Sequence, residues 1–124
     1  MSIRQPSVLY VDDEEMNLTL FKITFQDKFQ IHIARDGQEG LSLLQDKGRE
    51  LDTVVSDMRM PGMDGVDFIA QAKEKFPHLR CFILTGFPSN EKVRSALKDQ
   101  LIINSFSKPF DMEMIQKAVL NTAS

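Results

Sequence analysis

Polar side chains able to bind a metal ion or a phosphoryl group follow the short apolar segments of this 124-residue chain. Asp12 and Asp13 come after the first segment, Asp57 after the third, Thr85 after the fourth and Lys108 after the fifth. Carboxylates that lie close together raise one another's pKa unless a cation compensates their charge. Mg²⁺ suits a site of this kind, because it takes oxygen ligands and is commonly held by one or two carboxylates and a phosphate oxygen.

The same residue types are the ones needed to form an aspartyl phosphate. Asp57 can act as a carboxylate nucleophile, Lys108 supplies a flexible positive charge for a phosphoryl oxygen, and Thr85 supplies a neutral donor. In-line phosphoryl transfer depends mainly on positioning and charge neutralisation, which such a group would provide. Taken singly, each residue has a plainer explanation, since Asp12 and Asp13 can cap a helix and most aspartates are solvated.

These side chains can meet only if the apolar segments are strands of one sheet. Nearly continuous apolar runs predict strands at 7–11, 30–34, 51–56, 80–84 and 102–106. Amphipathic patterns between and after them predict helices at 14–25, about 36–46, 64–76 and 91–98, and a last helix from 111. In the first helix, apolar residues at three- and four-residue steps predict the buried side. They are Met16, Leu20 and Ile23 with the pair Phe21 and Phe25. Four residues are predicted to cap the later helices: Asp36, Asp64, Ser89 and Asp111.

Five strand-and-helix units predict an α/β fold, a doubly wound five-stranded parallel sheet with helices on both faces in three layers. The units average about 25 residues, which suits βαβ crossovers, and we expect residues 1–124 to form one domain. Ligands of such sheets bind beyond the carboxyl ends of the strands. The predicted fold therefore brings the three aspartates, the threonine and the lysine to one crevice.

Composition narrows the function classes. The single cysteine, Cys81, excludes an internal disulfide and, without a Cys/His cluster, a zinc staple. No apolar run approaches a membrane span and residues 1–6 do not resemble a secretory signal, so we expect a cytoplasmic protein outside the membrane. With 15 Lys and Arg against 18 Asp and Glu and no basic run, we expect no direct binding to nucleic acid.

Four motifs, taken together, resemble the receiver domain of two-component response regulators. They are Val11-Asp12-Asp13, the stretch from Asp57 through Pro61 and Gly62 to Gly65, Leu84-Thr85-Gly86, and Phe106-Ser107-Lys108-Pro109-Phe110. The resemblance covers the whole chain, with the motifs in order and suitably spaced. It implies a flavodoxin-like (βα)5 fold with the strand order 2-1-3-4-5.

The resemblance also implies a role for each site residue. Asp57 would accept a phosphoryl group from a kinase phosphohistidine, and Thr85 and Lys108 would contact that group. Asp13, Asp57 and the backbone carbonyl of Arg59 would ligate Mg²⁺ directly, and Asp12 would act through a metal-bound water. Pro109 would shape the turn that directs Lys108.

By the same resemblance, the chain would be a phosphorylation-dependent signalling switch and not an enzyme acting on a separate substrate. Its partners would be a histidine kinase or a histidine phosphotransfer protein, and a downstream protein or attached output domain. Phosphorylation would change partner affinity, or drive dimerisation, through the face formed by the fourth helix, fifth strand and fifth helix.

One position departs from the family pattern. Receivers commonly carry Tyr or Phe three residues before the lysine, where this chain has Ser105. Phe106 follows it and should point to the opposite face of the sheet. We therefore expect Phe87, or the backbone of residues 86–90, to transmit the signal instead of the usual ring.

Three other functions remain open from the sequence. A Mg²⁺-dependent phosphatase or phosphotransferase of the haloacid-dehalogenase type would need a second aspartate where Arg59 stands. A flavodoxin-type cofactor binder would need a phosphate-binding loop where Asp12 and Asp13 would repel the phosphate. A receiver used only for docking would not need the complete set of acids, threonine and lysine.

Overall fold

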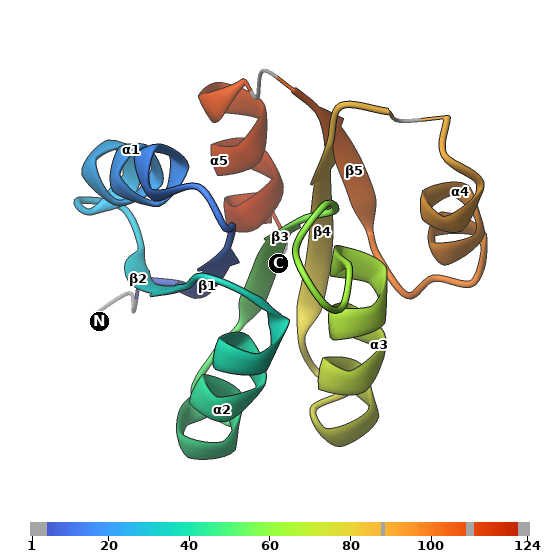
Figure 1. Cartoon of the computed structure of the whole chain (residues 1–124). Coiled ribbons are helices and arrows are strands. Elements are labelled where there is room, and N and C mark those ends of the chain that lie inside the picture. The colour runs from blue at the N-terminus through green and yellow to red at the C-terminus, as the bar shows by residue number, and fades with distance from the viewer. Residues whose placement is uncertain (1–4, 88, 109–110, 122–124) are drawn as a thin grey trace.

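The computed structural model of the chain describes residues 5–87, 89–108 and 111–121, and Figure 1 shows its helices and strands in strict alternation. The strands are β1 (Ser7–Val11), β2 (Gln30–Ala34), β3 (Thr53–Asp57), β4 (Arg80–Thr85) and β5 (Asn104–Ser107). The helices are α1 (Glu15–Phe25), α2 (Gly37–Lys47), α3 (Gly65–Lys75), α4 (Glu91–Lys98) and α5 (Met112–Asn121). None of the helices within the described ranges is long and apolar enough to cross a bilayer.

All neighbouring strands are parallel, and their order in the sheet is β2-β1-β3-β4-β5. This order confirms the topology that the resemblance implied. Every residue of β1 and β3 is buried, as expected for the inner strands of a sheet covered on both faces. Because β1, β3 and β4 are parallel neighbours, their carboxyl ends lie at one edge of the sheet.

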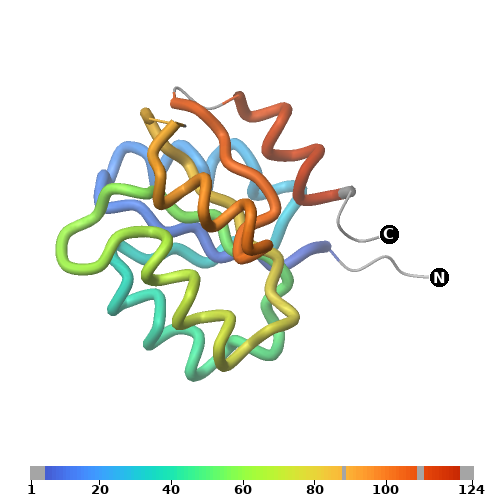
Figure 2. Tube along the Cα trace, turned by 90° about the vertical axis from the view of Figure 1, so that its right-hand side faces the viewer, coloured from blue at the N-terminus to red at the C-terminus, as the bar shows by residue number. Residues whose placement is uncertain are grey.

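Helices cover the two faces of the sheet and enclose two separate apolar cores, giving the three predicted layers. Leu44 of α2, Phe68 of α3 and Val93 of α4 belong to one core. Phe21 of α1 and Ile115 of α5 belong to the other. Figure 2 shows α2 and α3 running side by side on their face of the sheet. Successive strand residues alternate between the two cores, because side chains of a strand point to opposite faces.

The prediction of the buried side of α1 was partly wrong. Phe21 and Phe25 are buried as expected, but Met16, Leu20 and Ile23 are 83%, 48% and 62% exposed. The buried stripe instead runs through Leu18, Phe21 and Phe25. The physical reason is an aromatic stack: Phe21 lies on Tyr10 of β1 with ring centroids 4.1 Å apart, and Phe25 packs between Phe21 and Phe29. This stack fixes which side of α1 turns inward.

Three of the four predicted helix caps are confirmed. Asp36, Asp64 and Asp111 each accept hydrogen bonds from backbone N–H groups in the first turn of the following helix. The fourth prediction, Ser89, was wrong: Asn90 caps α4 by accepting from the backbone N–H groups of residues 92 and 93 at 2.8 and 3.2 Å. A cap must directly precede the first helical residue for its side chain to reach those donors, and α4 begins at residue 91.

Some strand ends also differ from the prediction. β3 begins at Thr53 and not at residue 51, β4 extends to Thr85, and β5 covers residues 104–107. Leu51 and Ile102 are nevertheless buried in the core that α2, α3 and α4 cover. Apolar residues beside a strand can be buried without joining its hydrogen-bonded ladder. The apolar pattern therefore predicted these strand ends one or two residues away from the observed ends of the ladder.

Candidate functional site

Three predicted aspartates form a cluster at the carboxyl edge of the sheet. One carboxylate oxygen from each of Asp12, Asp13 and Asp57 lies within 4.8 Å of the others. Asp12 is fully buried, Asp57 is 3% exposed, and Asp13 is open to solvent. The cluster forms because β1 and β3 are neighbours in register, with Val11 beside Ser56, so that both strands end at the same level.

Lys108 pairs with the buried aspartate. Its Nζ lies 2.8 Å from Oδ1 of Asp57, and its backbone N–H donates to the carbonyl of Thr85 at 3.0 Å. Burial raises the pKa of the Asp57 carboxyl above its ordinary value, and the charge of Asp12 raises this pKa further, while the bond to Lys108 opposes both. Lys108 therefore neutralises only part of the negative charge of the three carboxylates.

Asp12 is held by three hydrogen-bond donors. Its Oδ2 accepts from the Tyr10 hydroxyl at 2.7 Å and from Asn17 Nδ2 at 3.1 Å, and its Oδ1 accepts from the backbone N–H of Glu14 at 3.0 Å. Burial, followed by the bond to Asp12, raises the pKa of the Tyr10 phenol, so this hydroxyl remains a donor at neutral pH.

Sequence reasoning missed both side-chain donors of Asp12. Tyr10 is the only tyrosine of the chain and lies two residues before Asp12 along a strand, so the period of two would have placed both side chains on one face. Asn17 had no such signal, because its contact depends on how the first turn of α1 packs over the end of β1.

Thr85 is buried at the end of β4, and its Oγ1 accepts from the backbone N–H of Phe87 at 2.9 Å. It lines a small pocket of about 200 Å³ beside the aspartate cluster. The lining residues of this pocket are Asp57, Met58, Arg59, Thr85, Gly86, Phe87 and Lys108. The structure thus brings the proposed phosphoacceptor, hydroxyl and lysine to one cavity.

Arg59 and Phe87 lie together at the mouth of this pocket. The Arg59 guanidinium carbon is 5.6 Å from the centre of the Phe87 ring, and the ring is 62% exposed. Arg59 also lines a second cleft of about 530 Å³ that Asp13 and Asp64 share. A guanidinium over an aromatic face is an attractive arrangement, so each side chain helps to hold the other across the opening.

The loop after Asp57 returns tightly to the end of β3. Gly65, the first residue of α3, donates its N–H to the Met58 carbonyl at 2.9 Å. A β-carbon at this position would overlap the Asp57 carbonyl oxygen and would lie 2.7 Å from Ile83 Cδ1. Glycine is needed here because α3 begins against the backbone that carries Asp57.

The structure bears out the expectation that Ser105 and Phe106 lie on opposite faces of the sheet. Ser105 lies beside Ile83, whose side chain is in the core that α3 and α4 cover. Phe106 lies beside Leu84, stacks on Phe82 at 5.7 Å and belongs to the opposite core. The ring of Phe106 therefore packs on the face of the sheet that α1 and α5 cover. Pro109, which the resemblance assigned to the turn after Lys108, lies outside the described residues.

The donor set fits a hard divalent cation. The cluster offers oxygen ligands only, two of its three carboxylates are buried, and the one ion pair described for it is that of Asp57 with Lys108. Mg²⁺ prefers this chemistry and does not need a complete protein cage.

Known proteins match this chain along most of its length. Residues 8–120 match the family model of the response regulator receiver domain. The chain is 27% identical over 113 residues to sporulation initiation phosphotransferase F of Bacillus subtilis, covering 90% of this chain and 89% of that protein. It is 26% identical over 110 residues to the hydrogenase transcriptional regulatory protein HoxA of Cupriavidus necator, covering 89% of this chain. This match spans only 22% of HoxA, so the chain corresponds to about a fifth of that relative.

Solved structures agree with the family match. The signal receiver domain of an HD domain-containing protein from Pseudomonas fluorescens has a TM-score of 0.86 and 30% identity, covering 98% of this chain and 88% of that one. Chemotaxis protein CheY4 of Vibrio cholerae has a TM-score of 0.84 and 25% identity, covering 94% and 98%. The sheet order, the helices on both faces and the family match lead to one conclusion: the chain belongs to the response regulator receiver domains of two-component systems.

Proposed function

We propose that Asp57 accepts a phosphoryl group from a phosphohistidine of a histidine kinase or a histidine phosphotransfer protein. A carboxylate oxygen of Asp57 attacks phosphorus, the N–P bond of the phosphohistidine breaks, and its electron pair returns to the imidazole nitrogen. The observation that carries the proposal is the ion pair between buried Asp57 and Lys108 inside the three-aspartate cluster. Membership of the receiver family supports it.

Asp12, Asp13, Asp57 and the backbone carbonyl of Arg59 are the groups that would hold Mg²⁺. When bound, the ion would neutralise the charge of the aspartates and of the phosphoryl oxygens. Asp13 is open to solvent and lines the outer cleft, so a cation has a route to the cluster. Asp12 is already fixed by its hydrogen bonds before any cation arrives.

Lys108 and Thr85 would then reorganise around the phosphoryl group. Lys108 pairs with Asp57 in the unphosphorylated protein. Its flexible side chain would let the ammonium group move from Asp57 to a phosphoryl oxygen. Thr85 can donate its hydroxyl proton to another phosphoryl oxygen, because accepting from the Phe87 N–H uses only a lone pair of the hydroxyl oxygen.

A hydrogen-bonded path leads from Thr85 to α4. Phe87 donates its N–H to Thr85, its carbonyl accepts from the backbone N–H of Asn90 at 3.0 Å, and Asn90 caps α4. A shift of Thr85 toward a phosphoryl group would pull this loop and the start of α4. The path supplies a backbone route for the signal in a chain that has Ser105 where related receivers carry an aromatic ring.

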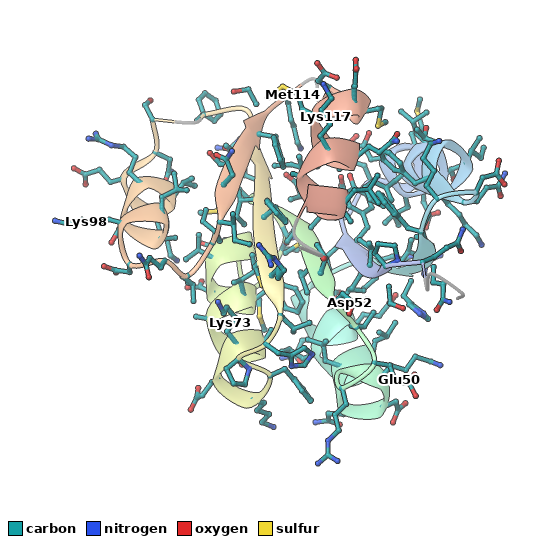
Figure 3. The ribbon with its side chains drawn as sticks, turned by 180° about the vertical axis from the view of Figure 1, so that it is seen from behind. Glu50, Asp52, Lys73, Lys98, Met114 and Lys117 are labelled. Carbon is teal, nitrogen blue, oxygen red and sulfur yellow. The ribbon has the colours of Figure 1, made fainter. Side chains whose placement is uncertain are left out.

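The face formed by α4, β5 and α5 is the proposed output surface. Figure 3 shows Lys98 on α4 and Met114 and Lys117 on α5, with β5 between the two helices. Met114 is 53% exposed, and Ile103 just before β5 is 47% exposed. Apolar side chains among lysines are suited to a protein partner or to a second phosphorylated copy of the chain.

Incubation with a small-molecule phosphodonor and Mg²⁺ tests the proposal. Mass spectrometry should find one added phosphoryl group on the wild type and on Asp46→Asn, which changes an exposed aspartate of α2. Asp57→Asn should gain none. Equal labelling of Asp57→Asn would rule out this phosphoacceptor. Repeated turnover of a phosphomonoester would instead favour a Mg²⁺-dependent phosphatase.

A further inference from the structure

The hydrogen bonds of Asp12 occupy most of its acceptor positions. A carboxylate offers about four lone-pair positions, two on each oxygen. Tyr10 and Asn17 fill both positions on Oδ2, and the backbone N–H of Glu14 fills one on Oδ1. Counting the bonds among the described residues, one position remains, and it is on Oδ1.

The two donors on Oδ2 are held by different parts of the fold. Tyr10 is fully buried in β1, and its ring stacks on Phe21 with an angle of 3° between the ring planes. Asn17 is half-buried in the first turns of α1. Both acceptor positions of Oδ2 are thus occupied, one by a donor from β1 and the other by a donor from α1.

Closing one oxygen affects the two common divalent cations differently. Ca²⁺ takes six to eight oxygens and often binds both oxygens of one carboxylate. Mg²⁺ takes one oxygen from each of one or two carboxylates and keeps several waters. With one free position on Oδ1, Asp12 can accept a hydrogen bond from a water that Mg²⁺ would retain, but it cannot offer both oxygens to Ca²⁺, so it penalises Ca²⁺ more than Mg²⁺.

We propose that Tyr10 and Asn17 are positioning residues that close Oδ2 of Asp12 and thereby make the aspartate cluster favour Mg²⁺ over Ca²⁺. This inference rests on the cation site of the proposed function and adds its selectivity. Neither residue touches the cation; each acts through Asp12.

Calorimetric titration with Mg²⁺ and with Ca²⁺, without any phosphodonor, tests the inference. Tyr10→Phe keeps the ring on Phe21 and removes only the donor, and Asn17→Ala removes the other donor from a helical position that tolerates alanine. Thr19→Ala, at an exposed position of the same helix, is the matched control.

Loss of an outer-shell hydrogen-bond partner in a metal site typically costs about 10- to 100-fold in affinity. We expect Tyr10→Phe to weaken Mg²⁺ binding about tenfold and Ca²⁺ binding by clearly less, so that the preference for Mg²⁺ falls. Asn17→Ala should change the preference in the same direction and less, because its bond is longer. Thr19→Ala should match the wild type.

A purely structural role would lower the affinity for both ions equally, so an unchanged ratio in Tyr10→Phe and Asn17→Ala would overturn the inference. Thermal unfolding without cations checks that each variant is folded. If Tyr10→Phe does not fold, Asn17→Ala alone decides the outcome. A wild type that binds no Mg²⁺ would overturn both this inference and the cation site of the proposed function, whereas Mg²⁺ binding with an unchanged ratio would overturn the inference only.

Discussion

Gly65→Ala should damage the fold at the point where it carries the site. A β-carbon at residue 65 would overlap the carbonyl oxygen of Asp57 and would lie 2.7 Å from Ile83 Cδ1 and 3.1 Å from Met58 Cα. The atoms of Asp57 and Met58 are backbone atoms at the end of β3, so they cannot rotate away as a side chain can. The start of α3 must therefore move away from the strand.

The expected cost follows from three effects. Adding a methyl group to a well-packed site costs about 1–3 kcal/mol. Displacing α3 also strains the hydrogen bond from the Gly65 N–H to the Met58 carbonyl, a bond of a kind that contributes about 1 kcal/mol. The lower entropy of the unfolded alanine chain returns about 0.4–1 kcal/mol. We expect a net loss of about 1–3 kcal/mol in the free energy of unfolding.

Urea denaturation of the wild type, Gly65→Ala and Gly86→Ala measures this effect. Gly86 is the matched control, because a β-carbon there would meet nothing within 4 Å. Gly86→Ala should be as stable as the wild type, or up to about 1 kcal/mol more stable. Gly65→Ala should also be phosphorylated more slowly, since Asp57 moves with its backbone. A Gly65→Ala protein that unfolds at the wild-type urea concentration would show that the close approach of α3 to β3 is wrong.

Three further outcomes are expected. Because burial raises the pKa of Asp57, its contribution to the stability of the cation-free domain is full below the unfolded value, about 3.9, and is lost as pH rises through the folded value. Denaturation in a chelator should therefore find Asp57→Asn gaining stability relative to the wild type as pH rises, and a constant difference would contradict the raised pKa. Lys92→Met removes exposed ion pairs of 2.7 Å to residues 64 and 67, and should lower the free energy of unfolding by no more than about 1 kcal/mol, and by less in high salt. A larger loss of stability in urea denaturation would contradict this expectation. Phe87→Ala removes the ring under Arg59, an attraction of about 0.5–1 kcal/mol, so the acyl phosphate should decay about two- to fivefold faster by mass spectrometry. An unchanged lifetime would show that this pair does not shield the site.

The sequence predicted the acidic cluster well because of a simple property of parallel sheets. Strands that run in the same direction end at the same edge, so finding where β1 and β3 end was enough to place Asp12, Asp13 and Asp57 together. The prediction did not depend on side-chain detail. Small errors in the strand limits, such as the later start of β3, changed nothing at the edge that carries the site.

Details that depend on packing were not predicted. In α1, steps of three and four residues fit two overlapping stripes, and the sequence pattern did not distinguish Met16, Leu20 and Ile23 from the stripe through Leu18. The stack of Tyr10 and Phe21 decided between them. The same stack also holds the ring whose hydroxyl binds Asp12, although the period of two along β1 already places Tyr10 and Asp12 on one face.

The proposed switch has a consequence for α4 that follows from its two attachments. The loop from Thr85 connects the start of α4 to the phosphoryl pocket. Lys92 connects the start of α4 to the start of α3 through ion pairs with Asp64 and Asp67. If Thr85 moves toward a phosphoryl group, either the hydrogen bonds of the loop or the ion pairs of Lys92 must give way. Lys92 is 44% exposed, and exposed pairs are worth only about 0–1 kcal/mol, so the ion pairs would yield first. The start of α4 would then follow Thr85, and the output face would change without an aromatic ring at Ser105.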